Sequence, residues 1–191
     1  MTALRTGIVV ALGVGLAGLL AGDAATVGAG PGLSDLSQPM RAVWNEVKWP
    51  FPIDQWGTGR AFQCRARDCG TEVNVYVRPK LGFCNCATGV SDDAELDRVG
   101  DLELLSPTFD GLRDGRPITV GWMKGRSRPY HVTIPYASPR TALAIAFNDK
   151  CDVVVATVVA DKSRIPAAEI AALEFLNGDL VLRWAERELG L

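Results

Sequence analysis

The sequence predicts an α+β protein, a single domain with a mainly antiparallel sheet and a few short helices packed to one side, stabilised by disulfides. Six short runs are rich in Val, Ile, Thr and aromatic residues and are bounded by Gly, Pro, Asn or Asp, as strands are. Few helical patterns separate these runs, which favours antiparallel neighbours. About 160 residues follow an apolar N-terminal segment, and this is the usual size of one domain.

Two of the runs have clear strand patterns. In residues 71–78, Val73, Val75 and Val77 fall on one face and polar side chains on the other, which indicates a half-buried strand. Residues 153–159 lack alternation and suit a central strand covered on both sides. The predicted strands are residues 60–64, 71–78, 118–123, 128–134, 141–147 and 152–160.

Helix signals are fewer. Asp92 followed by Glu95 resembles a capping box for a helix over 92–99. Pro166 is favoured at a first helical position and begins a second helix. Residues 39–46 have apolar spacing for one or two helical turns, and residues 179–189 are ambiguous between strand and helix.

The N-terminus has the order of features of an export signal. Arg5 precedes an apolar run over residues 6–22, and small residues follow through residue 30. We expect residues 1–24 to be a signal peptide, cut after Ala24 or Ala29, with an uncleaved membrane anchor as the alternative. Residues 25–38 then form a flexible spacer, and residues 39–191 form the globular domain.

An extended segment from Trp49 to Trp56, here named the strap, alternates aromatic residues with prolines. Proline restricts itself and its preceding residue to extended geometry, so the strap is expected to lie across a surface. Its aromatic residues either cap the open face of the sheet or form a ligand groove or a partner contact.

The five cysteines indicate an oxidising compartment. Cys64 and Cys69 flank a four-residue turn that brings them within disulfide reach. Cys84 and Cys86 are too close in sequence to bond without strain, and Cys151 is the natural partner for one of them. We therefore assign Cys64, Cys69, Cys86 and Cys151 to disulfides, although the pairing stays open and one thiol is left over.

The alternative is a metal or redox site. Cys64, Cys69, Cys84 and Cys86 together are four thiolates of the kind that copper(I) or zinc prefers. Their spacing is poor for zinc, which usually takes C-x2-C pairs or histidine support. The sequence otherwise predicts no cofactor, and a thiol redox pair remains part of this alternative.

Charged residues give two weaker signals. Lys124, Arg126 and Arg128 are predicted to form a basic turn between two strands, which is a candidate anion site. The acidic run over residues 92–103 is expected to be a solvated helix start. The net charge of −2 provides no basic excess, so nucleic-acid binding is excluded.

His131, the single histidine, has no recognisable catalytic partner in the sequence, and the hydrolase motifs G-x-S-x-G, S-x-x-K and H-E-x-x-H are absent. We therefore expect an exported protein of the cell envelope, periplasmic or otherwise extracytoplasmic, with a non-enzymatic binding or accessory role. Its expected partner is another envelope protein, and it contacts the membrane only if the N-terminal segment is uncleaved. The oligomeric state stays open, and enzyme activity is the less favoured reading.

Overall fold

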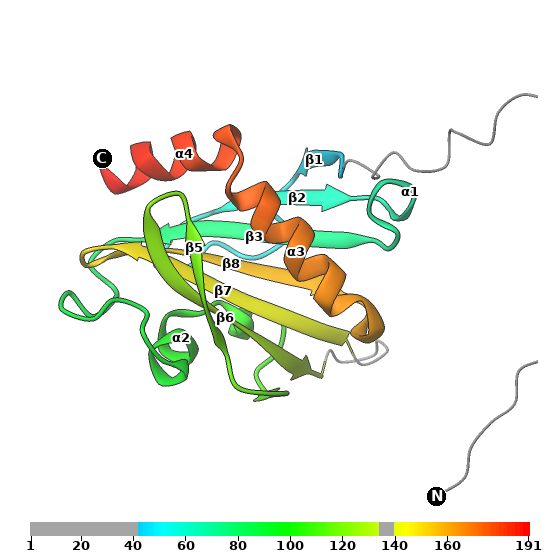
Figure 1. Cartoon of the computed structure of the whole chain (residues 1–191), viewed down its shortest axis with the longest axis horizontal. Coiled ribbons are helices and arrows are strands. Elements are labelled where there is room, and N and C mark those ends of the chain that lie inside the picture. The colour runs from blue at the N-terminus through cyan, green and yellow to red at the C-terminus, as the bar shows by residue number, and fades with distance from the viewer. Residues whose placement is uncertain (1–41, 134–139) are drawn as a thin grey trace, which may run out of the picture. The chain divides into compact units, whose positions relative to one another are not determined.

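The computed structural model describes residues 42–133 and 140–191, which form an eight-stranded sheet in the order β1-β2-β3-β8-β7-β6-β4, with β5 also paired to β6 (Figure 1). Every pair of neighbours is antiparallel, so the predicted fold class is confirmed. The strands are β1 (Trp44–Val47), β2 (Arg60–Cys64), β3 (Val73–Lys80), β4 (Phe109–Gly111), β5 (Arg116–Val120), β6 (Met123–Val132), β7 (Arg140–Asp149) and β8 (Asp152–Ala160). The helices are α1 (Ala66–Cys69), α2 (Asp93–Val99), α3 (Ile165–Leu176) and α4 (Asp179–Leu189), with short 3-10 helices at Leu102–Leu104 and Lys162–Arg164.

The core lies on both faces of the central strands. Alternate residues of β8 point to opposite faces, so Val154 and Ala156 belong to one apolar cluster while Val153 and Val155 belong to another. This double burial explains the unbroken apolar run in the sequence, and β8 is the predicted central strand.

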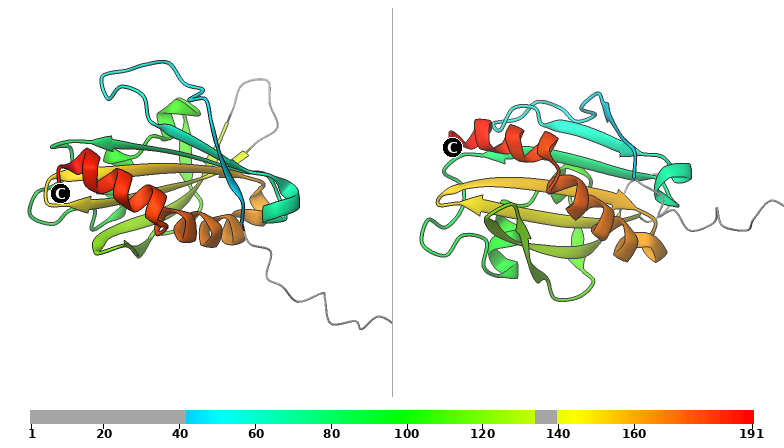
Figure 2. Two further views of the ribbon diagram at one scale, coloured as in Figure 1. Left: turned by 90° about the horizontal axis from the view of Figure 1, so that it is seen from above. Right: turned by 45° about the horizontal axis from the view of Figure 1, so that its top comes forward.

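The helices divide between the two faces. Helices α3 and α4 cover one face, where Ala172 and Trp184 are buried in the first cluster. Helix α2 covers the other, where Leu96 and Val99 are buried in the second cluster (Figure 2). The expectation that all helices pack to one side is therefore wrong, because each sheet face carries a complete set of apolar side chains that needs a cover.

Local signals explain how the helices begin. The Asp92 side chain accepts a hydrogen bond from the backbone N–H of Glu95, as the capping-box pattern predicts. Proline stands in the first turn of α3, also as predicted. The ambiguous segment 179–189 is helix α4, which buries Val181, Trp184 and Ala185 at helical spacing.

Two sequence-based predictions of local structure are wrong. The segment expected to be helical from residue 39 contains strand β1, because pairing with β2 outweighs a weak helical spacing, and residues 39–41 lie outside the described part. The expected basic turn at Lys124 to Arg128 is the interior of β6. The turn itself falls earlier, at Gly121, whose φ of 58° suits glycine.

A buried carboxylate fixes α3 to the sheet. Glu169 is 4% exposed and accepts hydrogen bonds from the Ser127 hydroxyl and from Arg116 Nε, the latter at 2.9 Å. Burying a carboxylate is costly unless such partners satisfy it.

The predicted signal or anchor (1–24) and spacer (25–38) lie outside the described residues.

Candidate functional site

The strap crosses the face of the sheet that α2 also covers (Figure 2). Its Trp49 and Phe51 rings meet Tyr76 of β3 edge-on, with ring centroids 6.2 Å and 4.8 Å apart. Such contacts contribute beyond the apolar area that they bury. The strap therefore caps this end of the sheet.

Gly59 lets the chain return from the strap into β2. A β-carbon at this position would lie 2.4 Å from the carbonyl oxygen of Val77 and 2.6 Å from the Trp49 ring. No other residue fits without displacing backbone, so glycine is required where the strap joins the sheet.

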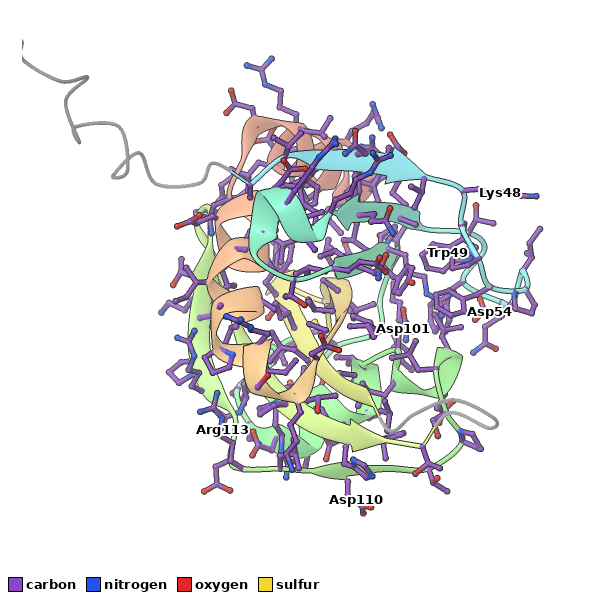
Figure 3. All side chains as sticks on the ribbon, turned by 90° about the vertical axis from the view of Figure 1, so that its right-hand side faces the viewer. Lys48, Trp49, Asp54, Asp101, Asp110 and Arg113 are labelled. Carbon is purple, nitrogen blue, oxygen red and sulfur yellow. A yellow bond between two sulfur atoms is a disulfide. The ribbon has the colours of Figure 1, made fainter. Side chains whose placement is uncertain are left out.

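An arginine beneath the strap forms the centre of an ion cluster. Arg78 is 2% exposed, and its guanidinium donates to both carboxylate oxygens of Asp101, at 2.6 and 2.8 Å. It also donates to both oxygens of Asp54, at 2.7 and 2.9 Å. Asp54 belongs to the strap and Asp101 follows α2, and Figure 3 labels both. Arg78 therefore joins three segments.

Lys80 extends this ion cluster along β3. Its ammonium group lies 2.7 Å from Asp101 and donates to the carbonyl oxygens of Val99 and Gly100, at 2.7 and 3.3 Å. These carbonyls end α2, where a cation is favoured by the helix dipole. The lysine is 4% exposed, so the protein supplies nearly all of its solvation.

The pKa shifts follow from this arrangement. Burial alone would lower the pKa of Arg78, but its bonds to Asp101 and Asp54 outweigh burial and raise it. Burial lowers the pKa of Lys80, although the charge of Asp101 opposes the shift. The hydrogen bond from Arg78 lowers the pKa of Asp54.

Acid is expected to loosen the strap. The lowered pKa of Asp54 means that its ionised form stabilises the fold above the ordinary value of 3.8, and this contribution is lost as the pH falls below that value. The difference in unfolding free energy between wild type and Asp54→Asn should therefore be constant near neutral pH and shrink as the pH falls below 3.8. Urea titrations followed by tryptophan fluorescence at each pH measure the difference.

Asp110→Asn is the matched control. Asp110 is exposed at the other edge of the sheet, where Figure 3 labels it. Its side chain makes no hydrogen bond or ion pair within the described residues. Its variant should change the free energy of unfolding by less than about 0.5 kcal/mol. A difference for Asp54→Asn that does not shrink in acid would show that the Arg78 contact does not hold the strap.

A groove of about 560 Å³ opens beside the ion cluster, between the strap and the segment that follows α2. Trp56 and Phe83 form an aromatic wall, with ring centroids 4.5 Å apart. Lys80 lies 5.6 Å and 5.4 Å from these rings, a cation–π arrangement that holds them against the cluster. The groove is lined by Asp54, Gln55, Trp56, Arg78, Lys80, Phe83, Asp97, Arg98, Gly100, Asp101, Glu103, Leu104 and Phe109.

Two polar side chains of the groove remain uncommitted. Gln55 on the strap and Glu103 on the opposite wall are exposed, and neither forms a hydrogen bond or ion pair with another described residue. By contrast, the exposed Arg98 is bonded to Glu95 at 2.6 Å and to the carbonyl of Phe83 at 2.8 Å. The groove thus presents aromatic rings with a free amide and a free carboxylate.

The cysteines form two separate disulfides. Cys64 is joined to Cys69, and Cys86 is joined to Cys151, while Cys84 is a buried free thiol. In the sheet, Cys64 lies opposite the first residue of β3, whereas Cys84 and Cys86 come after the last residue of β3. The four cysteines of the alternative metal or redox site therefore lie at opposite ends of a strand, and three of them are oxidised.

No group of three or more His, Cys, Asp or Glu side chains suited to a metal ion occurs within residues 42–133 and 140–191. His131 lies in β6 between Asp110 of β4 and Thr141 of β7. It shares a strand face with Ser127, whose hydroxyl is committed to Glu169.

The predicted anion site is occupied by acidic side chains. Arg126 is hydrogen-bonded to Asp93, and Arg128 Nη1 donates to Asp97 at 3.0 Å. Lys124 is exposed at the start of β6. The acidic run is correspondingly less solvated than expected, because α2 lays its aspartates over the arginines of β6.

No sequence pattern identified Arg78, Lys80 and Asp101 as a cluster. The available signal was the continuation of the alternation past residue 78, which puts Arg78 and Lys80 on the face that Tyr76 shares. Two cations on a face that also carries an aromatic residue predict a buried counter-ion, but not which acid supplies it.

Comparisons with known proteins provide no functional assignment. No protein-family model matches the sequence. No curated protein matches it. Among solved structures, protein PA94 of Pseudomonas aeruginosa, a protein of unknown function, is similar at 14% identity and a TM-score of 0.37, over 75% of this chain and 84% of that one.

Within the described residues, no helix is both long enough and apolar enough to cross a membrane.

Proposed function

We propose that this chain is an exported, non-enzymatic binding or accessory protein of the cell envelope, and that it holds a protein partner in the groove beside the strap. The observation that supports this proposal is a groove whose walls are held in place by the buried ion cluster. Arg78, Lys80 and Asp101 satisfy one another, so their charges position the walls and are not spare groups for acid–base chemistry.

The surface left open suits recognition. Trp56 and Phe83 offer rings of the kind enriched at protein interfaces, and both are partly exposed. Gln55 and Glu103 flank these rings with polar atoms that have no partner in the described part of the chain. A partner polypeptide would match this pattern if its apolar side chain packed against the rings and its own flanking donors or cations met Gln55 and Glu103.

The disulfides support an oxidising location. Thiols stay reduced in the cytosol, and two disulfides in one domain are typical of proteins that fold outside it. Export through the N-terminal segment would bring the domain to such a compartment.

Photo-crosslinking in the native cells tests the groove. A benzophenone amino acid at position 55 should form an adduct with one partner, and Trp56→Ala or Glu103→Lys in the same chain should reduce that adduct at least tenfold. Trp122→Ala and Glu174→Lys are matched controls, because both positions are exposed outside the groove. The proposal fails if the groove variants and the controls give equal yields.

Fractionation tests the location. The mature protein should be found outside the cytosol, and its N-terminal mass should show a cut after Ala24 or Ala29 or an intact anchor. Alkylation under denaturing, non-reducing conditions should label a single thiol per chain. Five labelled thiols in a cytosolic fraction would exclude an envelope role.

A further inference from the structure

Three cysteines meet where β3 has ended and β8 begins. Cys86 is exposed and bonded to Cys151, and Cys84 is 6% exposed two residues earlier. The backbone N–H of Cys84 donates to the carbonyl oxygen of Cys151 at 3.1 Å, and its thiol donates to the carbonyl of Lys150 at 3.2 Å. The free thiol therefore lies against the same two-residue segment that the disulfide holds.

We infer that Cys151 has two alternative disulfide partners and that the Cys86–Cys151 bond exchanges internally for a Cys84–Cys151 bond.

The reaction needs no external oxidant or reductant. The Cys84 thiolate attacks Sγ of Cys151, a Cys84–Cys151 bond forms, and the Cys86–Cys151 bond breaks. Cys86 leaves as a thiolate and takes up the proton that Cys84 gave to solvent. One disulfide and one thiol are present before and after, so the exchange is balanced within the chain.

The backbone geometry permits both bonds. The backbone nitrogen of Cys84 lies 3.1 Å from the carbonyl oxygen of Cys151, so the two backbones are in direct contact there. A disulfide spans α-carbons about 4.4 to 6.8 Å apart, a separation that such direct backbone contact allows. The Sγ of Cys86 itself lies 4.0 Å from the Cys84 carbonyl oxygen, which keeps all three sulfur-bearing residues in one small volume.

The structure also explains why Cys84 stays protonated at rest. Burial raises the pKa of its thiol to about 11, the charges of Glu95 and Asp152 act in the same direction, and Arg98 opposes them. Since only the thiolate attacks, the exchange rate should rise about tenfold per pH unit below that pKa. The leaving thiolate on Cys86 is exposed and therefore hydrated.

Exchange would affect the groove, and this consequence rests on the proposed function. Phe83 precedes Cys84 directly and forms the aromatic wall with Trp56. Moving the covalent anchor from Cys86 to Cys84 places the constraint on the residue next to Phe83. The two disulfide isomers would thus present different groove walls to a partner.

Peptide mapping of the wild-type protein tests the exchange. The protein is held without added thiol at pH 7 and pH 9.5, quenched with acid, alkylated after denaturation, and mapped by mass spectrometry. Label should move from Cys84 to Cys86 at a rate that is independent of protein concentration and roughly a few hundred times faster at pH 9.5. Label confined to Cys84 at both pH values, after days of incubation, overturns the proposal.

Two variants check the isomers separately. Cys86→Ser, oxidised with glutathione disulfide, should form Cys84–Cys151 and retain no free thiol, while Cys84→Ser should retain Cys86–Cys151. Two free thiols in a Cys86→Ser protein whose circular dichroism matches wild type count against the inference. If this variant does not fold, wild-type mapping decides.

The crosslink from position 55 separates the two proposals. If mapping shows exchange but both variants give the wild-type adduct, only the coupling to the groove fails. If no adduct forms with any protein while exchange is observed, the proposed function fails and the exchange stands.

Discussion

Asp101→Ala is expected to lower the free energy of unfolding by about 3–5 kcal/mol, which is the usual cost of removing one partner from a buried ion pair. Asp101 is 6% exposed and is the carboxylate that both Arg78 and Lys80 contact. Its loss leaves two buried cations with Asp54 as their remaining carboxylate, and Asp54 is 38% exposed. Urea titration monitored by tryptophan fluorescence measures the effect.

Two matched variants make this prediction specific. Asp54→Ala should cost about 1 kcal/mol because water can replace a half-exposed carboxylate. Asp110→Ala, at an exposed position without a side-chain partner within the described residues, should change stability by less than about 0.5 kcal/mol. Equal effects for Asp101→Ala and Asp54→Ala would mean that the ion cluster is open to solvent and does not fix the groove.

The ion cluster marks the boundary of what local sequence patterns predict. Alternation over residues 71–78 correctly places Val73, Val75 and Val77 in the core, because every second residue of a strand shares a face. The same rule puts Arg78 and Lys80 on the other face. It cannot identify Asp54 and Asp101, which are 24 and 23 residues from Arg78 in the sequence. These residues meet Arg78 only when the strap and α2 fold over β3.

The expected basic turn shows the same limit. The segment from Lys124 to Arg128 was expected to turn, yet its Gly125 pairs with Ile118 of β5 and Phe147 of β7 within β6. Pairing with strands on both sides outweighs the local preference of glycine. Once the segment is a strand, its arginines point to the α2 face, where Asp93 and Asp97 meet them.

For the cysteines, spacing narrows the choice but cannot complete it. A short turn between Cys64 and Cys69 favours their bond from sequence alone, and the structure contains it. Cys84 and Cys86 are equivalent candidates for Cys151 in sequence, since two residues apart they point the same way in an extended chain. The turn after β3 breaks this equivalence by burying Cys84 and exposing Cys86.

Removing the Cys86–Cys151 bond should cost more than removing the Cys64–Cys69 bond. In a Cys84→Ala background, which prevents any substitute bond, Cys86→Ala/Cys151→Ala should lower the free energy of unfolding by about 4 kcal/mol. Cys64→Ala/Cys69→Ala should lower it by about 2 kcal/mol. The sequence separations are 65 and 5 residues, and a longer loop restricts the unfolded chain more.

Urea titrations of the three proteins measure both differences, and the m-values show whether the unfolded chain has expanded as the loop model requires. The larger effect should appear with a larger m-value, because an unfolded chain without the long cross-link exposes more surface. Equal losses, or a larger loss for the short loop, would mean that core packing around Cys64, which is fully buried, dominates over chain entropy. In that case loop length does not decide how much each disulfide stabilises the fold.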